Sequence, residues 1–178
     1  IIIHESDSVP GLTNKISGRF AKKIELSFES AQKYFENKNI NVTGNPIRQE
    51  LFEYLSFDSG LAKKRLGMDS DKPLVFILGG SLGSVRINDF IERVSGELFK
   101  KYQIIHQTGT ANFQKIKDKQ KPGYKIIAFL ESKDYGEIMA ASDLVISRSG
   151  AGAIFEIAAF GKPSILIPLP KPPATTKK

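Results

Sequence analysis

The sequence contains no cysteine, no tryptophan and only two histidines among its 178 residues. The lack of cysteine excludes disulfide bonds and metal sites built on thiolates, and it is compatible with a reducing compartment. Long apolar runs are also missing, since the longest, LVFIL and SILIPL, have the length of a strand and not the roughly 18 residues of a membrane-spanning helix. The first three residues, III, lack the basic flank of a signal peptide, and we interpret them as the last half of a buried strand.

Negative charge is the scarcer sign, with 19 Asp and Glu against 26 Lys and Arg, which gives a formal net charge of +7. Such a surplus suits anionic partners, whether phosphorylated small molecules, nucleic acid or an acidic membrane surface. Proteins that bind single-stranded nucleic acid interleave aromatic and basic residues on strands, and this pattern is not found here. We therefore expect no nucleic-acid partner.

From residue 72 onward, short β-branched runs alternate with amphipathic segments. This alternation predicts an α/β fold with a parallel sheet and right-handed crossovers. The expected strands are 74–78, 103–106, 125–129, 144–147 and 164–168. The expected helices are 56–71, the amphipathic segment 84–101, 111–119, 133–141 with Ser132 as its cap, and 150–160.

The first 45 residues have a different pattern, in which the loop HESDSVPGLTNK leads into a helix and a strand candidate, AKKIELSF, follows. The segment INVTGNPIR ends a further strand at Asn45-Pro46, a dipeptide that favours a turn. We place a domain boundary there. The expected division is the end of one domain over 1–45, a second domain over 46–170 and a polar, proline-rich tail over 171–178.

Two corners of the predicted sheet are rich in glycine and serine, each between the end of a strand and the start of a helix. Ligands of open parallel sheets bind at the carboxyl ends of the strands, and the first amides of a helix attract anions. Two such corners in one sheet predict a ligand with phosphate, although the first corner alone could be a tight turn without a ligand. The corners are Gly79, Gly80, Ser81 and Gly83 after the first strand, and Ser149, Gly150, Ala151 and Gly152 after the fourth.

Glu156 lies in an apolar helical run, between Phe155 and Ile157. Burying an unpaired carboxylate is costly, so this side chain needs water or a partner. A sugar diol would supply two donors to its two oxygens. The alternative is a solvent-facing residue at the polar edge of the helix, and the helix alone does not decide between them.

Two common nucleotide motifs are excluded. The first corner has the spacing Gly-Gly-x-x-Gly and not G-x-G-x-x-G, and the next strand ends in IIHQTG without an acidic residue for an adenosine ribose. No glycine loop is followed by G-K-[ST], so a P-loop is also excluded.

Five segments, in order, resemble the MurG-type bacterial cell-wall glycosyltransferases of family 28: HESDSVPGLTNK, VTGNPIR, GGSLGSVRIN, HQTG and SRSGAGAIFEIAAFGKPSILIPLP. The resemblance runs from His4 to about Pro170. It implies a GT-B fold, with a Rossmann-like parallel-sheet domain preceded by the tail of a second Rossmann-like domain. The implied reaction is the inverting transfer of N-acetylglucosamine from UDP-GlcNAc to lipid I, which forms lipid II in peptidoglycan synthesis.

The resemblance also implies a donor site, residue by residue. Each role suits its residue type, since arginine forks onto phosphate, helix-start amides bind anions and a carboxylate chelates a diol. Ala153 departs from the family, which commonly has threonine there, and offers an amide but no hydroxyl. The implied contacts are Arg48 and Ser81 with the diphosphate, the amides of Ala151, Gly152 and Ala153 with phosphate, Glu156 with the ribose hydroxyls and the Leu130 backbone with the uracil, with Gly80 and Gly83 in the same UDP-GlcNAc site.

On the acceptor side, the resemblance implies that His4, Glu5, Asp7 and Asn14 line the cleft between the domains. Ser6 and Asp7 replace a glutamine and an asparagine of the family, so position 7 loses its amide donors. The alternative for His4 is a loop histidine bonded to a backbone carbonyl.

Two parts of the family pattern are not found in these 178 residues. One is the glycine-rich loop with a histidine, the region of the catalytic base, and the other is a glutamine pair that reads the sugar, where this sequence has PLPKPPATTKK. We therefore expect a fragment that binds UDP without transferring sugar, and we assign no catalytic residue.

The resemblance implies no cofactor and no metal, since Arg48 and helix amino ends can neutralise the diphosphate and no Asp-x-Asp motif occurs. The implied partners are a UDP-sugar, a polyprenyl-diphosphate-linked acceptor and an anionic membrane surface. The implied location is peripheral, at the cytoplasmic face of the bacterial plasma membrane. The alternatives are a GT-B glycosyltransferase with another acceptor and a non-catalytic nucleotide-binding module.

Overall fold

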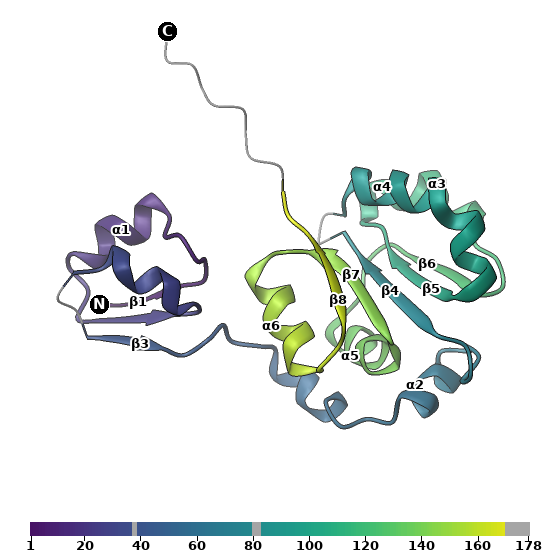
Figure 1. Ribbon diagram of the computed structural model, residues 1–178, viewed down its shortest axis with the longest axis horizontal. Helices are drawn as coiled ribbons and strands as arrows, with labels where there is room; N and C mark the ends of the chain where they lie inside the picture. Colours follow the sequence, from purple (N-terminus) through teal and green to yellow (C-terminus); the bar gives the residue numbers. More distant parts are fainter. Residues whose placement is uncertain (37–38, 80–82, 170–178) are drawn as a thin grey trace, which may run out of the picture.

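The computed structural model describes residues 1–36, 39–79 and 83–169, which form two parallel sheets (Figure 1). The smaller sheet has the order β1-β2-β3. Its elements are β1 (Ile2–Glu5), α1 (Leu12–Gly18), β2 (Lys23–Leu26), the 3₁₀ helix η1 (Glu29–Tyr34) and β3 (Ile40–Val42).

The larger sheet has the order β6-β5-β4-β7-β8, and all its strands are parallel. The chain reaches it through the 3₁₀ helix η2 (Gln49–Tyr54) and α2 (Ser59–Arg65). The remaining elements are β4 (Leu74–Leu78), α3 (Val85–Lys101), β5 (Gln103–Gln107), α4 (Thr110–Ile116), η3 (Lys117–Lys119), β6 (Tyr124–Ile127), α5 (Ser132–Ala141), β7 (Leu144–Arg148), α6 (Ala151–Ala159) and β8 (Ser164–Ile167).

Helices cover both faces of the larger sheet, which explains why all five residues of β4 are buried. On one face, Ile87 and Ile91 of α3 pack with Val75 and Ile77 of β4, and residues of α4 pack around them. On the other face, η2, α2, α5 and α6 enclose a second apolar cluster around Phe76. A strand buried on both sides needs apolar residues at every position, and the run LVFIL meets this requirement.

The predicted α/β class is confirmed, and the strands agree with the prediction to within one or two residues at their ends. The helix predicted over 56–71 is shorter. It begins at Ser59 because the Asp58 carboxylate accepts a hydrogen bond from the Leu61 N–H at 2.7 Å, and the chain leaves it at Gly67, where φ is +70°.

Two further predictions are corrected. Ser132 is the first residue of α5 and not its cap, because Glu131 holds the extended cap position and the Ser132 hydroxyl bonds elsewhere. The amino-terminal residues do form a strand, but Ile1 and Ile2 are 73% and 68% exposed, because within the described residues β1 has a neighbour on one side only.

A buried polar network links β5, α3 and β6 at His106, which is fully buried. Its Nε2 lies 3.0 Å from Asn88 Oδ1, which can only accept, so Nε2 carries the hydrogen. Its Nδ1 lies 3.0 Å from the Tyr124 hydroxyl, which donates to it. Burial lowers the pKa of His106 to about 4 and raises that of Tyr124 to about 12. The imidazole is therefore neutral in the fold at neutral pH.

This network predicts a loss of stability in weak acid. The folded pKa of His106 lies below its usual value of 6.5, so the unfolded chain binds the proton more readily. Its contribution is complete above about pH 6.5 and falls by up to about 3 kcal/mol as the pH drops to about 4. Urea unfolding across this range should show the fall for the wild type and a smaller one for His106→Gln. An unchanged slope in His106→Gln would contradict the assignment.

Candidate functional site

The two glycine-rich corners lie next to each other in the fold. Strands β4 and β7 are neighbours, with Leu78 opposite Ser147 at their carboxyl ends. From β4 the chain runs outward to β5 and β6 and then returns to the other side of β4. Ligands of open α/β sheets bind where the strand order reverses in this way. Gly80 and Ser81 lie outside the described residues, so their contacts stay predictions.

The glycines that flank the first corner are required by the packing of the chain itself. A Cβ at Gly79 would stand 2.4 Å from the Ser84 nitrogen. A Cβ at Gly83, where φ is +76°, would stand 2.0 Å from the Thr108 carbonyl oxygen. No larger residue fits either position without a shift of backbone. Gly79 and Gly83 therefore have a structural reason to be glycine, as the tight-turn alternative expected.

The second corner is open. Helix α6 follows Gly150, and no side chain of the described part of the chain caps its amino end. The Ile154 N–H is bonded to the Gly150 carbonyl, and the amides of Ala151, Gly152 and Ala153 before it are the ones that a helix start leaves without a partner in the helix. Among the residues that the structure describes, a Cβ at Gly150 or Gly152 would meet no heavy atom within 4 Å. The amides at the start of α6 therefore have no partner within the helix, and Gly150 and Gly152 leave room for an added side-chain atom.

Glu156, one turn and a half into α6, is 8% exposed and is paired with Arg48. The Arg48 Nε donates to Oε1 at 2.8 Å, and Nη2 donates to Oε2 at 3.0 Å. Two parallel bonds are the strong form of this ion pair. From the sequence, either a ligand diol or solvent could contact this carboxylate. In the structure, both of its oxygens accept bonds from an arginine that lies 108 positions earlier in the chain.

Two residues of α5 hold the guanidinium from other sides. Ser132 Oγ accepts a bond from Arg48 Nη1 at 3.3 Å, and the guanidinium carbon lies 4.3 Å from the centre of the Tyr135 ring. The hydrogen bond to Glu156 raises the pKa of Arg48, while burial and then Glu156 raise that of Tyr135. Sequence reasoning missed Ser132 and Tyr135. Both lie in the first turns of the helix after β6, at the same edge of the sheet, and this position could have indicated them as site residues.

Leu130 lies in the same part of the fold. The residue as a whole is 6% exposed, and it belongs to the apolar cluster that includes Ile157 of α6. Within the described ranges, no hydrogen bond involves the Leu130 backbone. Its N–H and C=O are therefore free of protein partners there, which a contact to a base requires.

Arg148, at the end of β7, joins the two corners and was also missed. It donates from Nη2 to Ser84 Oγ at 2.6 Å and from Nη1 to the Pro168 carbonyl at 3.3 Å. Ser84 in turn caps α3 through the Ile87 N–H. The signal was present in the segment SRSG, where an arginine directly follows a predicted strand.

The four acceptor-side residues form one cluster in the smaller sheet. Glu5 is buried, and its carboxylate accepts from the Asp7 N–H at 2.8 Å and from Asn14 Nδ2 at 3.0 Å. His4 Nε2 lies 3.1 Å from the Gly44 carbonyl oxygen, which is the contact that the alternative for His4 expected. These bonds order the loop, and contact with an acceptor stays a prediction.

Phe155, next to Glu156, packs against the part of the chain that carries the smaller sheet. Its ring lies edge to face on Phe28, with 5.3 Å between ring centres. A Cβ at Gly44, where φ is +77°, would lie 3.0 Å from the same ring. Because the Gly44 carbonyl faces His4, a single glycine separates the acceptor-side cluster from α6.

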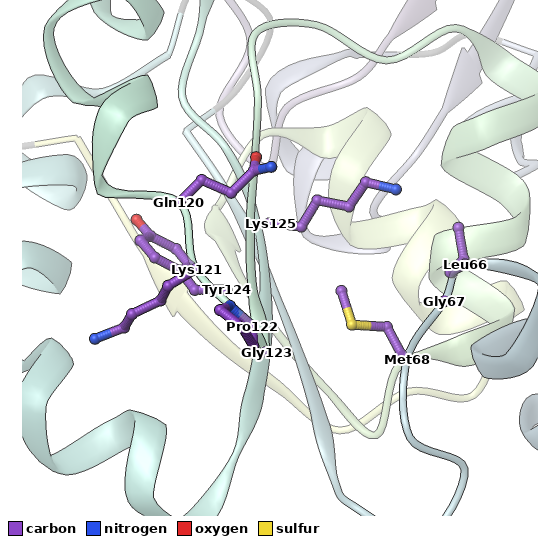
Figure 2. Close-up of a pocket in the computed structure, with 9 residues that line it drawn as sticks. All are labelled: Leu66, Gly67, Met68, Gln120, Lys121, Pro122, Gly123, Tyr124 and Lys125. Carbon is purple, nitrogen blue, oxygen red and sulfur yellow. The ribbon is translucent and has the colours of Figure 1, made fainter.

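A pocket of about 460 Å³ lies away from this region, between the segment that follows α2 and the start of β6 (Figure 2). Lys121, Lys125 and Met68 are among its lining residues. It contains none of the predicted site residues. Over the described parts of the chain, no group of three His, Asp or Glu side chains is placed to hold a metal ion, and no helix has the length and apolar character of a membrane span.

Residues 74–175, more than half of the chain, match the glycosyltransferase family 28 C-terminal domain. A Bacillus cereus protein named UDP-N-acetylglucosamine--N-acetylmuramyl-(pentapeptide) pyrophosphoryl-undecaprenol N-acetylglucosamine transferase 2 is 42% identical over 171 residues, which cover 96% of this chain and 47% of the relative. The Clostridium tetani protein of the corresponding name is 40% identical, over 96% of this chain and 46% of the relative. The chain thus spans about half the length of these relatives.

The fold is similar to that of solved structures. Acinetobacter baumannii MurG superposes with a TM-score of 0.63 and 24% identity, over 96% of this chain and 46% of that one. Anabaena HepE, crystallised with UDP and glucose, gives a TM-score of 0.56 and 18% identity over 93% of this chain and 52% of that one. At these identities the likeness establishes the fold alone, and the predicted GT-B type of parallel-sheet architecture is confirmed.

The two corners predict opposite effects of adding one methyl group. Gly83→Ala forces a positive φ on alanine and a clash with the Thr108 carbonyl, so it should lower the free energy of unfolding by about 3 kcal/mol. Gly152→Ala enters open space in a helix and should raise the same free energy by about 0.5–1 kcal/mol. Urea unfolding of both variants measures this. Equal effects would contradict the described backbone at Gly83.

Proposed function

The chain belongs to glycosyltransferase family 28, and from this premise we propose that it holds the donor-nucleotide site of an enzyme that transfers N-acetylglucosamine from UDP-GlcNAc to lipid I, forming lipid II with inversion at the sugar. Since the chain spans about half the length of its relatives, the transfer is proposed for the whole enzyme. Nucleotide binding is proposed for these 178 residues.

The observation that carries this proposal is the open amino end of α6 beside the Arg48–Glu156 pair, at the reversal of strand order. The helix start supplies amides and a partial positive charge for a phosphate. Arg48 supplies a forked cation for the diphosphate, and Glu156 supplies two acceptors for a ribose diol. The free backbone of Leu130 lies in the part of the fold where the uracil would sit.

The two sheets suggest that acceptor binding and donor binding are divided between two domains. We assign residues 1–45 to the end of the acceptor-binding domain, residues 46–170 to part of the UDP-sugar domain and residues 171–178 to a tail. His4, Glu5, Asp7 and Asn14 then face a polyprenyl-diphosphate-linked acceptor. No cofactor or metal takes part in this scheme, since Arg48 and the helix amides neutralise the leaving diphosphate.

The proposed location follows from the acceptor. A lipid-linked acceptor and a nucleotide-sugar donor meet at the cytoplasmic face of the bacterial plasma membrane, so we propose peripheral association there. The net charge of +7 favours an anionic surface. A GT-B enzyme with another acceptor is the close rival. Transfer assays of the whole enzyme with UDP-GlcNAc, UDP-galactose and UDP-glucose on a lipid I analogue separate the two, because the proposed enzyme should react with the first donor alone and the rival should not use this acceptor.

The proposal predicts that UDP binds at the α6 amino end. Ala151→Pro removes one amide hydrogen at the first helical position, where proline is tolerated and the preceding Gly150 is already extended. Because a hydrogen bond to a charged group is worth about 1.5–3 kcal/mol, the Kd for UDP should rise by about tenfold or more. Isothermal titration calorimetry measures the change.

Ser59→Pro is the matched control, since it places proline at the first position of α2, where Ser59 bonds to the Ala141 carbonyl at the amino edge of the sheet. This variant should bind UDP as the wild type does. The lack of any UDP binding at millimolar concentration, or an equal loss in both variants, would refute the proposed site.

A further inference from the structure

We propose that the Arg48–Glu156 ion pair is a specificity determinant that couples recognition of the ribose diol to recognition of the diphosphate. In the free protein, each of these two side chains is the hydrogen-bonding partner of the other. A ligand must replace the pair with its own diol and its own phosphates. This inference rests on the proposed function and concerns the selectivity of the same site.

The geometry makes the two uses of Glu156 exclusive. Arg48 holds both carboxylate oxygens through two parallel bonds, which occupy the outer edge of the carboxylate. A diol that chelates both oxygens needs this same edge. The Glu156 side chain is only 11% exposed and the Arg48 side chain is 38% exposed, so the guanidinium covers the accessible side of the carboxylate. The diol can enter only after the guanidinium has left.

A ligand that offers one of the two groups therefore leaves a charge without its partner. A phosphate that takes Arg48 leaves the Glu156 carboxylate buried without its cationic partner, which is unfavourable. A diol that takes Glu156 leaves Arg48 with the Ser132 hydroxyl and the Tyr135 ring. Only a ligand with both groups, a ribonucleoside diphosphate, satisfies both charges after the exchange.

Ser132 and Tyr135 act as positioning residues in this exchange. Tyr135 is 6% exposed, and its ring is fixed by Phe76, 5.8 Å away between ring centres. When the guanidinium leaves Glu156, the Tyr135 ring and the Ser132 hydroxyl are the contacts that it can keep. They keep Arg48 at the carboxyl edge of the sheet, on the side of α6, where a diphosphate at the helix start can reach it.

The test compares UDP, uridine and inorganic pyrophosphate on the 178-residue chain by calorimetry. In Glu156→Gln the pair is broken without a change of shape, so Arg48 is released while the ribose contact is weakened. Pyrophosphate should bind about tenfold more tightly than to the wild type, whereas UDP should bind about tenfold more weakly. These opposite changes are expected if the two groups restrain each other, provided that the gain for pyrophosphate exceeds the gain from the loss of one negative charge.

Glu50→Gln is the control for charge alone, since Glu50 is exposed and acts on Arg48 only through its field. It should leave pyrophosphate binding within about twofold of the wild type. A reciprocal variant, Arg48→Met, should bind uridine more tightly than the wild type. If that variant does not fold, the Glu156→Gln comparison still decides.

Pyrophosphate affinity that is unchanged or lower in Glu156→Gln would overturn the inference, as would an equal gain in Glu50→Gln. The proposed function has a separate point of failure. If UDP does not bind the wild type, both proposals fail. If UDP binds the wild type but the opposite changes are not seen, only the coupling is wrong.

Discussion

The pairing of β4 with β7 is the constraint on which the rest of the structure depends. At this pair the order in which the chain adds strands to the sheet reverses. The pairing also brings together the ends of the two strands, Leu78 and Ser147, which are almost seventy residues apart in the chain. The α6 amino end lies at the resulting edge. Both helix-covered faces are buried, so the open places at this edge are its loops and helix starts.

The ion pair between Arg48 and Glu156 is the second organising element, and it answers why an apolar helix carries a carboxylate. The charge is stable in a buried position because a forked guanidinium satisfies both oxygens. The guanidinium in turn needs Ser132 and Tyr135. One carboxylate of α6 is thus tied to the connection between the sheets and to the start of α5, and a ligand at α6 would act on all three.

Much of the fold could be predicted from the sequence because strands buried on both sides leave unbroken apolar runs such as LVFIL. The two glycine-rich turns were recognised in the sequence, but the reasons for glycine differ between them. At Gly83 a side chain would clash with the Thr108 carbonyl, whereas at Gly152 the described residues leave room for one. The partner of Glu156 could not be predicted, since nothing local relates residues 108 positions apart. The length of α2 was overestimated because the Asp58 cap, and not the apolar spacing, decides where that helix begins.

The central claim is that a uridine nucleotide binds at the α6 amino end and takes over the Arg48–Glu156 pair. The most direct measurement is a UDP titration followed by ¹⁵N NMR of the Arg48 side-chain Nε–H signal together with the Ala151 and Gly152 amides. The account predicts that all three signals shift along one saturable curve. Saturation of the chain by UDP with the Arg48 signal and these amides unchanged would contradict it.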